Sequence, residues 1–215
     1  MTGERRIIAV LSAACVVLLA IAVWAVATRG RGSPSTPRAT FWIARGGSDA
    51  GSGSGADPWR TLQHAADTVA PGSLVYVRGG VYDQRLQIRV SGMPGRPITF
   101  AAAPGEQVAL DGSSLEVPPD QNAMITVESQ SYIQVRGFEI TGYRTDVTGH
   151  VPIGILVTGA SDHIRIESNF VHDMGTTFEG RNGGDAHGIG VFGTAADHPI
   201  EDIRIVGNEL ARLSL

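Results

Sequence analysis

The sequence predicts an all-β chain in which residues 41–215 form a right-handed parallel β-helix, a solenoid of stacked coils. Short strands with alternating apolar residues recur in three tandem segments, and Gly or Asn stands at the end of the second strand of each. Glycine is abundant, at 28 residues, as turn-rich all-β folds require. These observations favour one elongated domain built from repeated coils.

The repeat rests on two series of strands. The first strands of the three segments are residues 125–127, 155–157 and 189–191, at spacings of 30 and 34 residues. The second strands centre on Ile133, Ile164 and Ile203, at spacings of 31 and 39 residues. A fixed strand pattern with variable spacing indicates insertions in the loops between strands, which is typical of stacked coils.

Gly137, Asn169 and Asn208 follow the second strands, and we expect them to occupy one corner of successive coils. Gly and Asn adopt a positive φ at low cost, so each can bend the chain sharply there. The Asn amides would then hydrogen-bond along the stack as a ladder. This role is structural, and the corner is assigned no chemistry.

The N-terminus predicts export. Arg5 and Arg6 precede an uninterrupted apolar run over residues 7–27, long enough to cross a bilayer as a helix. Residues 1–28 are therefore a signal peptide or an uncleaved signal anchor, and both alternatives stay open. The only cysteine, Cys15, lies inside this run and is interpreted as a packing residue. Residues 29–40 are predicted to be a linker, which places residues 41–215 outside the cell or on its surface.

Residues 41–97 are predicted to form an N-terminal cap with the first strands. A helix over residues 59–70 has one apolar face, and Pro71 and Gly72 end it. The first coil of a parallel stack exposes an unpaired edge, which this helix is well placed to cover. Residues 98–215 are predicted to be coils, and the sequence stops part-way through a unit, so an incomplete β-helix is expected.

Composition limits the functional classes. The formal net charge is −4, which argues against nucleic-acid binding. All 17 basic residues are Arg, so no chemistry in this chain can use a Lys base. No cysteine is left for a disulfide outside the apolar run. Membrane contact is expected only through residues 7–27, and a monomer is expected.

Several segments resemble the pectate-lyase-like β-helix superfamily. They are residues 46–49, 57–65, 71–82, 95–100 and 110–112. The resemblance implies a fold that acts on or binds an acidic polysaccharide, with a cleft along the first sheet and its preceding loops. It also makes a Ca²⁺ cofactor possible, although the sequence does not identify a metal site.

The long loop over residues 172–188 is the predicted site. Strand alternation turns Thr126, Leu156 and Gly190 outward on the first sheet, and none of these is an acid, a base or a metal ligand. The loops before the first strands carry the reactive groups instead. The predicted catalytic residues are Asp185, His187 and Arg181. The predicted substrate-binding residues are His172, Asp173, Glu179, Tyr143, Arg144 and His150.

Three functions remain open at this stage. The first is a polysaccharide lyase or epimerase whose catalytic coils mostly follow residue 215. The second is a non-catalytic surface solenoid that binds glycans. The third is a glycoside hydrolase of the polygalacturonase type, which would need a close pair of aspartates. No two aspartates are adjacent in this sequence.

Overall fold

The computed structural model describes residues 39–119, 122–177, 184–193 and 199–214. The chain divides into two compact units, Met1–Ser35 and Thr36–Leu215. The predicted export segment and nearly all of the predicted linker lie outside the described residues. Ala39 and Thr40, assigned to the linker, belong instead to the first strand. Among the helices described, none is long and apolar enough to span a bilayer.

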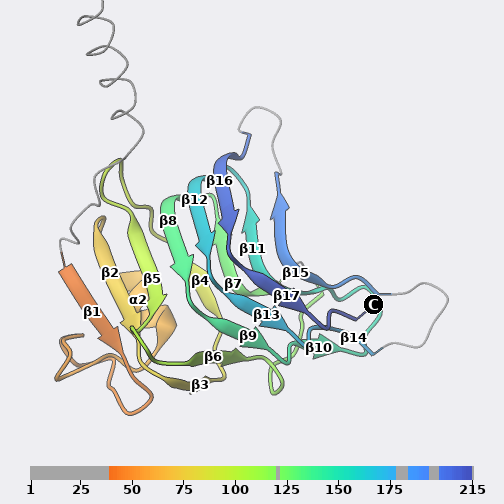
Figure 1. Cartoon of the computed structure of the whole chain (residues 1–215), viewed down its shortest axis with the longest axis horizontal. Helices are drawn as coiled ribbons and strands as arrows, with labels where there is room; N and C mark the ends of the chain where they lie inside the picture. Colours follow the sequence, from red (N-terminus) through yellow and green to blue (C-terminus); the bar gives the residue numbers. More distant parts are fainter. Residues whose placement is uncertain (1–38, 120–121, 178–183, 194–198, 215) are drawn as a thin grey trace, which may run out of the picture. The chain divides into compact units, whose positions relative to one another are not determined.

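The described residues of the unit Thr36–Leu215 form three large parallel sheets, one two-stranded parallel pair and one short helix (Figure 1). The six-stranded sheet contains, in order, β1 (Ala39–Ile43), β2 (Ser73–Val77), β5 (Ile98–Ala102), β8 (Ser131–Arg136), β12 (Asp162–Glu167) and β16 (Glu201–Val206). The five-stranded sheet contains β3 (Gly80–Tyr82), β6 (Val108–Asp111), β9 (Glu139–Thr141), β13 (Phe170–His172) and β17 (Glu209–Ala211). The four-stranded sheet contains β4 (Leu86–Ile88), β7 (Asn122–Glu128), β11 (Pro152–Thr158) and β15 (His187–Phe192). A short pair joins β10 (Arg144–Thr145) to β14 (Gly175–Thr176).

The strand register confirms the predicted repeat. Ile155 pairs with Ile125 on one side and with Ile189 on the other. Ile164 likewise pairs with Ile133 and Ile203. Each coil therefore passes from the four-stranded sheet to the six-stranded sheet and then to the five-stranded sheet, and every strand lies beside its counterpart one coil away. The predicted all-β, parallel β-helix architecture is confirmed for the described coils.

Stacked aliphatic side chains from all three sheets fill the interior. Ile125 and Ile155, Ile133 and Ile164 are fully buried, with 0% of their surface exposed. Burial of one such side chain contributes about 1.5–3 kcal/mol to stability. Because each rung repeats the same residue type at the same position, the core continues from coil to coil.

The corner after the second strand differs from the prediction by one residue. The residues with positive φ are Gly137 (77°), Ser168 (54°) and Gly207 (65°), which follow the paired residues Arg136, Glu167 and Val206. Asn169 and Asn208 come one position later, level with Phe138. The placement of Gly137, Asn169 and Asn208 at one matching position was therefore wrong, because spacings of 31 and 39 residues take Gly137 to Ser168 and Gly207.

The predicted Asn ladder is nevertheless present. The Asn169 side-chain amide donates to Oδ1 of Asn208 at 2.9 Å, and its own Oδ1 accepts from the Phe138 backbone N–H at 3.1 Å. Each amide also donates to a backbone carbonyl one coil back, Asn169 to Val135 and Asn208 to Ile166. Asn169 is only 1% exposed, so these bonds replace water that cannot reach the corner.

The predicted N-terminal helix is present as the shorter α2 (Leu62–Thr68), and the Thr61 side chain caps its N-terminus. Its buried residues Leu62 and Ala65 join the core. The helix contacts β4, the last strand of the four-stranded sheet. Gln63 forms two hydrogen bonds with the Gln87 backbone, donating to its carbonyl and accepting from its N–H, both at 3.0 Å.

Candidate functional site

The outer face of the four-stranded sheet has the predicted outward row. Gln87, Thr126, Leu156 and Gly190 lie side by side in register on consecutive strands. None of them is an acid, a base or a strong metal ligand. Leu156 is only 2% exposed although it points away from the core, because Phe192 and neighbouring apolar residues pack over it. The row is therefore uncharged, and apolar side chains cover its Leu156 end.

His187 lies on the same outer face. It pairs with Ile153, which belongs with Leu156 to the small apolar cluster outside the main core. The imidazole meets the Phe192 ring edge-on, with ring centroids 5.5 Å apart. The Phe192 ring also lies over Gly190, where an added Cβ would come within 2.6 Å of the ring. His187 and Phe192 thus form a partly exposed aromatic ledge, which we call the His187–Phe192 ledge.

Asp185 lies close to this ledge in sequence but outside its strand. Strand β15 begins at His187, so strand alternation does not determine the direction of Asp185. Asp185 is exposed, and the preceding Gly184 lies against the Thr176 side chain of β14. The expectation that Asp185 and His187 face the same side of one extended strand therefore loses its basis. The predicted residues Glu179 and Arg181 lie outside the described residues.

His172 and Asp173 belong to a different cluster, which lies where strand β13 of the five-stranded sheet ends. The His172 Nε2 atom lies 3.0 Å from Oε1 of Glu139, and its Nδ1 atom lies 2.6 Å from Oδ2 of Asp173. Arg212 donates two hydrogen bonds to the Asp173 carboxylate, at 2.9 and 2.8 Å. The predicted residue Arg144 donates to the Asp173 backbone carbonyl at 2.9 Å. The structure therefore brings together three of the six predicted substrate-binding residues.

This cluster joins three consecutive coils. Glu139 comes from β9, His172 from β13, and Arg212 directly follows β17. Arg212 and His172 both contact the Asp173 carboxylate. Hydrogen bonds from Arg212, and then from His172, hold the pKa of the Asp173 carboxyl well below its ordinary value of 3.8. Because its charges are paired internally, the cluster is suited to linking coils rather than to binding an incoming charge.

The paired state of Asp173 predicts an acid-dependent stability. A carboxyl with a lowered folded-state pKa stabilises the fold above its unfolded pKa, and this stabilisation is lost as the pH falls through the folded pKa. We expect Asp173→Asn to melt below the native protein at pH 7, with the difference shrinking from about pH 5 downward. Thermal unfolding of both proteins from pH 7 to pH 3 measures this. Melting curves that stay equally far apart at every pH would contradict it.

Tyr143 and His150 hold their loop in place. Tyr143 is fully buried among core residues, with Arg85 lying 5.4 Å from its ring centroid. Burial raises the pKa of its phenol group. The Tyr143 ring is therefore part of the core, whereas the sequence predicted it among the substrate-binding residues of a surface site. His150 Nδ1 lies 2.5 Å from the Val117 carbonyl oxygen, which ties its loop to the preceding coil.

Sequence reasoning missed Glu139, Arg212 and Phe192. The repeat itself carries the signal that would have found the first two, because the register pairs Thr141 with His172 and His172 with Ala211. Glu139 and Arg212, which lie within two residues of Thr141 and Ala211, are therefore expected near His172. Phe192 could not be found from alternation alone, since its ring folds back over Gly190.

Across the described part of the chain, no three His, Cys, Asp or Glu side chains are arranged to hold a metal ion. The loop carboxylates near the N-terminal end instead accept backbone hydrogen bonds. Asp49 accepts from the N–H groups of Arg60 and Thr61, both at 2.9 Å, and Asp57 accepts from Ser52.

Residues 41–198 match the family described as "Pel9A-like, right handed beta helix region". The uncharacterised protein YwoF of Bacillus subtilis is 34% identical over 148 residues, which are 69% of this chain and 31% of YwoF. Pectate lyase PEL9 of Emericella nidulans is 27% identical over 154 residues, covering 69% of this chain and 38% of the lyase. The chain thus spans about a third of the length of these relatives.

Solved structures share the fold. A GH136 lacto-N-biosidase from Eubacterium ramulus superposes with a TM-score of 0.64 at 18% identity, over 81% of this chain and 34% of the biosidase. The crystal structure of pectate lyase Pel9A gives a TM-score of 0.53 at 20% identity, over 84% of this chain and 48% of the lyase. At these identities the likeness concerns the fold alone.

Proposed function

Because the chain belongs to the Pel9A-like right-handed β-helix family, we propose that it is the polysaccharide-holding part of an exported protein that acts on an acidic polysaccharide. The names of the relatives support this class, since pectate is a uronate polymer and both PEL9 and Pel9A are called pectate lyases. The chain belongs to the pectate-lyase-like family. That it acts on an acidic polysaccharide is our proposal.

The His187–Phe192 ledge carries the proposal. It lies on the same outer face as the partly exposed, uncharged residues Gln87 and Thr126, which stand on adjacent strands of the four-stranded sheet, so a polymer can extend from the ledge across neighbouring coils. Sugar rings present apolar C–H faces that pack on aromatic rings, and the partly exposed ledge offers such a surface. The exposed Asp185, two residues before His187, can accept hydrogen bonds from sugar hydroxyls.

The chemistry that fits this ledge is proton removal beside a uronate carboxylate. Such a lyase or epimerase needs a base and a cation that neutralises the carboxylate. With no Lys in the chain, the proposal gives the base role to His187 or Asp185 and the cation role to Arg181 or to a bound Ca²⁺. The pectate-lyase-like family motivates the Ca²⁺ alternative; no residue is assigned to hold it.

A non-catalytic glycan-binding solenoid is the second candidate. The observation that favours it is the lack of any acid or base along the row Gln87, Thr126, Leu156 and Gly190. A binding surface needs only shape and hydrogen-bonding groups, and the partly exposed Gln87 and Thr126 supply such groups in this row.

Two measurements on the same protein separate the two candidates. The full chain is incubated with polygalacturonate, alginate and chondroitin, and ultraviolet absorbance reports the unsaturated product of elimination. Affinity electrophoresis in gels containing the same polymers reports binding. Product that is lost in His187→Ala or Asp185→Ala supports catalysis at the ledge. Binding without product that weakens in Phe192→Ala supports the solenoid that only binds.

A matched control is His163→Ala, which removes an exposed imidazole from the six-stranded sheet and is expected to change neither readout. Neither product nor binding with any of the three polymers would sink the proposal. Catalysis unaffected by both His187→Ala and Asp185→Ala would remove the ledge as its site.

Two finer parts of the proposal concern the N-terminal side. We propose that residues 1–28 direct export, and fractionation of cells expressing the full chain tests this; a protein confined to the cytoplasm would contradict it. We also propose that α2 closes the outer edge of β4, which the two Gln63–Gln87 hydrogen bonds support. Faster hydrogen exchange of the Gln87 amide in Gln63→Ala is expected, and unchanged exchange would refute that role.

A further inference from the structure

The outer face of the six-stranded sheet carries a second set of exposed polar and aromatic side chains. Strand register places Trp42, Tyr76, Ala101, Arg136, Glu167 and Val206 in one row, one residue from each consecutive strand. Their neighbours along the strands, such as Val75, Val135 and Ile166, are fully buried. Alternation therefore turns this whole row away from the core.

A shallow pocket opens in the middle of the row. Its lining residues are Tyr76, Ala102, Pro104, Arg136, Gly137, Glu167 and Ser168. Ala102, at the end of the strand that lies between those of Tyr76 and Arg136, lines the hollow with its small side chain. Two strand spacings separate Tyr76 and Arg136, which is about 10 Å.

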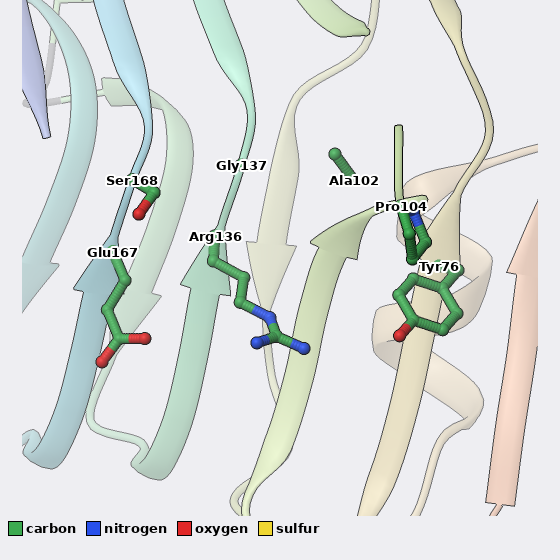
Figure 2. A pocket seen from close by; sticks show the side chains of 7 residues that line it. All are labelled: Tyr76, Ala102, Pro104, Arg136, Gly137, Glu167 and Ser168. Carbon is green, nitrogen blue, oxygen red and sulfur yellow. The ribbon is translucent and has the colours of Figure 1, made fainter. Parts of the chain in front are cut away.

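The Arg136 side chain points from its own strand toward Tyr76 (Figure 2). Figure 2 shows the Arg136 side chain extending across the neighbouring strand toward the Tyr76 ring, with the Glu167 carboxylate on its other side. Arg136 is exposed and Glu167 is partly exposed, and they are paired neighbours in the register. Within the described residues, the two form no ion pair with each other. The guanidinium is therefore available to bind a planar anion with two parallel hydrogen bonds.

An aromatic surface flanks the pocket. The rings of Trp42 and Tyr76 lie next to each other, with centroids 5.1 Å apart and planes tilted by 39°. Arg78 lies 4.9 Å from the Trp42 ring centroid and donates to the Gly55 carbonyl at 3.0 Å, so this edge is held in place. The Tyr76 ring offers its face to a sugar while its neighbours restrict its motion.

We propose that this pocket is a binding site for an acidic sugar residue, separate from the His187–Phe192 ledge. The Arg136 guanidinium binds the carboxylate, the Tyr76 ring packs against the sugar ring, and Glu167 and the Ser168 hydroxyl take hydrogen bonds from or give them to the sugar hydroxyls. The pocket holds its ligand without changing it chemically. In a protein that handles an acidic polysaccharide, such a site anchors the polymer on a second face of the solenoid.

The proposal differs from the function proposed for the ledge in its residues and in its sheet. If the ledge does not bind polysaccharide, the Arg136 pocket can still bind it. The reverse also holds. The test therefore uses Phe192→Ala as the background protein, so that binding at the ledge does not mask binding at the pocket.

The probe is trigalacturonate, with neutral galactotriose as the uncharged comparison. Isothermal titration calorimetry measures affinity, and the backbone amide signals of Gly137 and Ser168 report the location by NMR. We expect trigalacturonate to bind, to shift both amide signals, and to lose affinity about tenfold or more in Arg136→Gln. Arg136→Lys, which keeps the charge but not the planar fork, is expected to lose less. Galactotriose is expected to bind far more weakly than trigalacturonate.

Arg89→Gln is the charge-matched control, because Arg89 is an exposed arginine on the α2 side of the molecule. Its Nη1 atom lies 3.9 Å from Oδ1 of Asp67. It is expected to leave the affinity unchanged. Circular dichroism melting confirms that each variant is folded. Equal affinity of Arg136→Gln and the background protein, equal binding of both trisaccharides, or unshifted Gly137 and Ser168 signals would each overturn the proposal.

Discussion

Asn169→Ala is expected to lower the free energy of unfolding by about 2–5 kcal/mol, because it leaves two buried backbone groups without partners. The Asn169 side chain accepts from the Phe138 N–H at 3.1 Å and donates to the Val135 carbonyl at 3.2 Å. The residue is 1% exposed, so water cannot replace these bonds. Urea unfolding followed by circular dichroism measures the loss as a lower midpoint at unchanged slope.

Two further variants isolate the cause. Asn169→Asp keeps the shape and the oxygen that faces Phe138 but loses the amide donor, and its negative charge meets the Asn208 Oδ1 atom across 2.9 Å. We expect a loss at least as large as that of the Ala variant at neutral pH. Asn208→Ala removes the next rung of the ladder, where the side chain is only partly buried. It should cost less than half as much, and equal small effects in all three variants would show that the ladder contributes little.

The coil repeat could be predicted because it depends on period-two alternation and on spacing, both of which are local in sequence. Ile125, Ile155 and Ile189 pair as the spacing of their segments requires. The corners were predicted less well. Tyr132, His163 and Asp202 also adopt positive φ, between 48° and 57°, at equivalent positions in three coils. Nothing in these residue types identifies such a corner, because the stack itself imposes the conformation.

The candidate site was predicted least well because side chains in loops do not follow an alternation rule. The sequence grouped His172, Asp173, Asp185 and His187 in one loop, residues 172–188. The structure separates them, since His172 ends β13 in the five-stranded sheet and His187 begins β15 in the four-stranded sheet. Residues that are close along the chain therefore lie on different sheets. The partners of His172 come instead from neighbouring coils, 33 and 40 residues away.

Tyr143→Ala is expected to cost about 3–5 kcal/mol of stability, because truncation of a large buried ring leaves a cavity. Tyr143 is fully buried, and it fills the space beside Gly112, where an added Cβ would come within 2.6 Å of the Tyr143 Cβ. Arg144 is adjacent in sequence but exposed. Arg144→Ala is therefore expected to cost less than about 1 kcal/mol. Urea unfolding of both variants tests this division between neighbours.

Tyr143→Phe separates a packing role from a substrate-binding role. It keeps the ring and removes only the hydroxyl, whose hydrogen bond to the Glu116 carbonyl is long at 3.4 Å. The loss of stability should stay below about 1 kcal/mol, and polysaccharide binding should not change. A Phe variant of native stability that no longer binds polygalacturonate would place the Tyr143 hydroxyl at the substrate and refute its assignment to the core. Since the ring is closed off from solvent, such an outcome would also require the loop over residues 144–150 to open during binding.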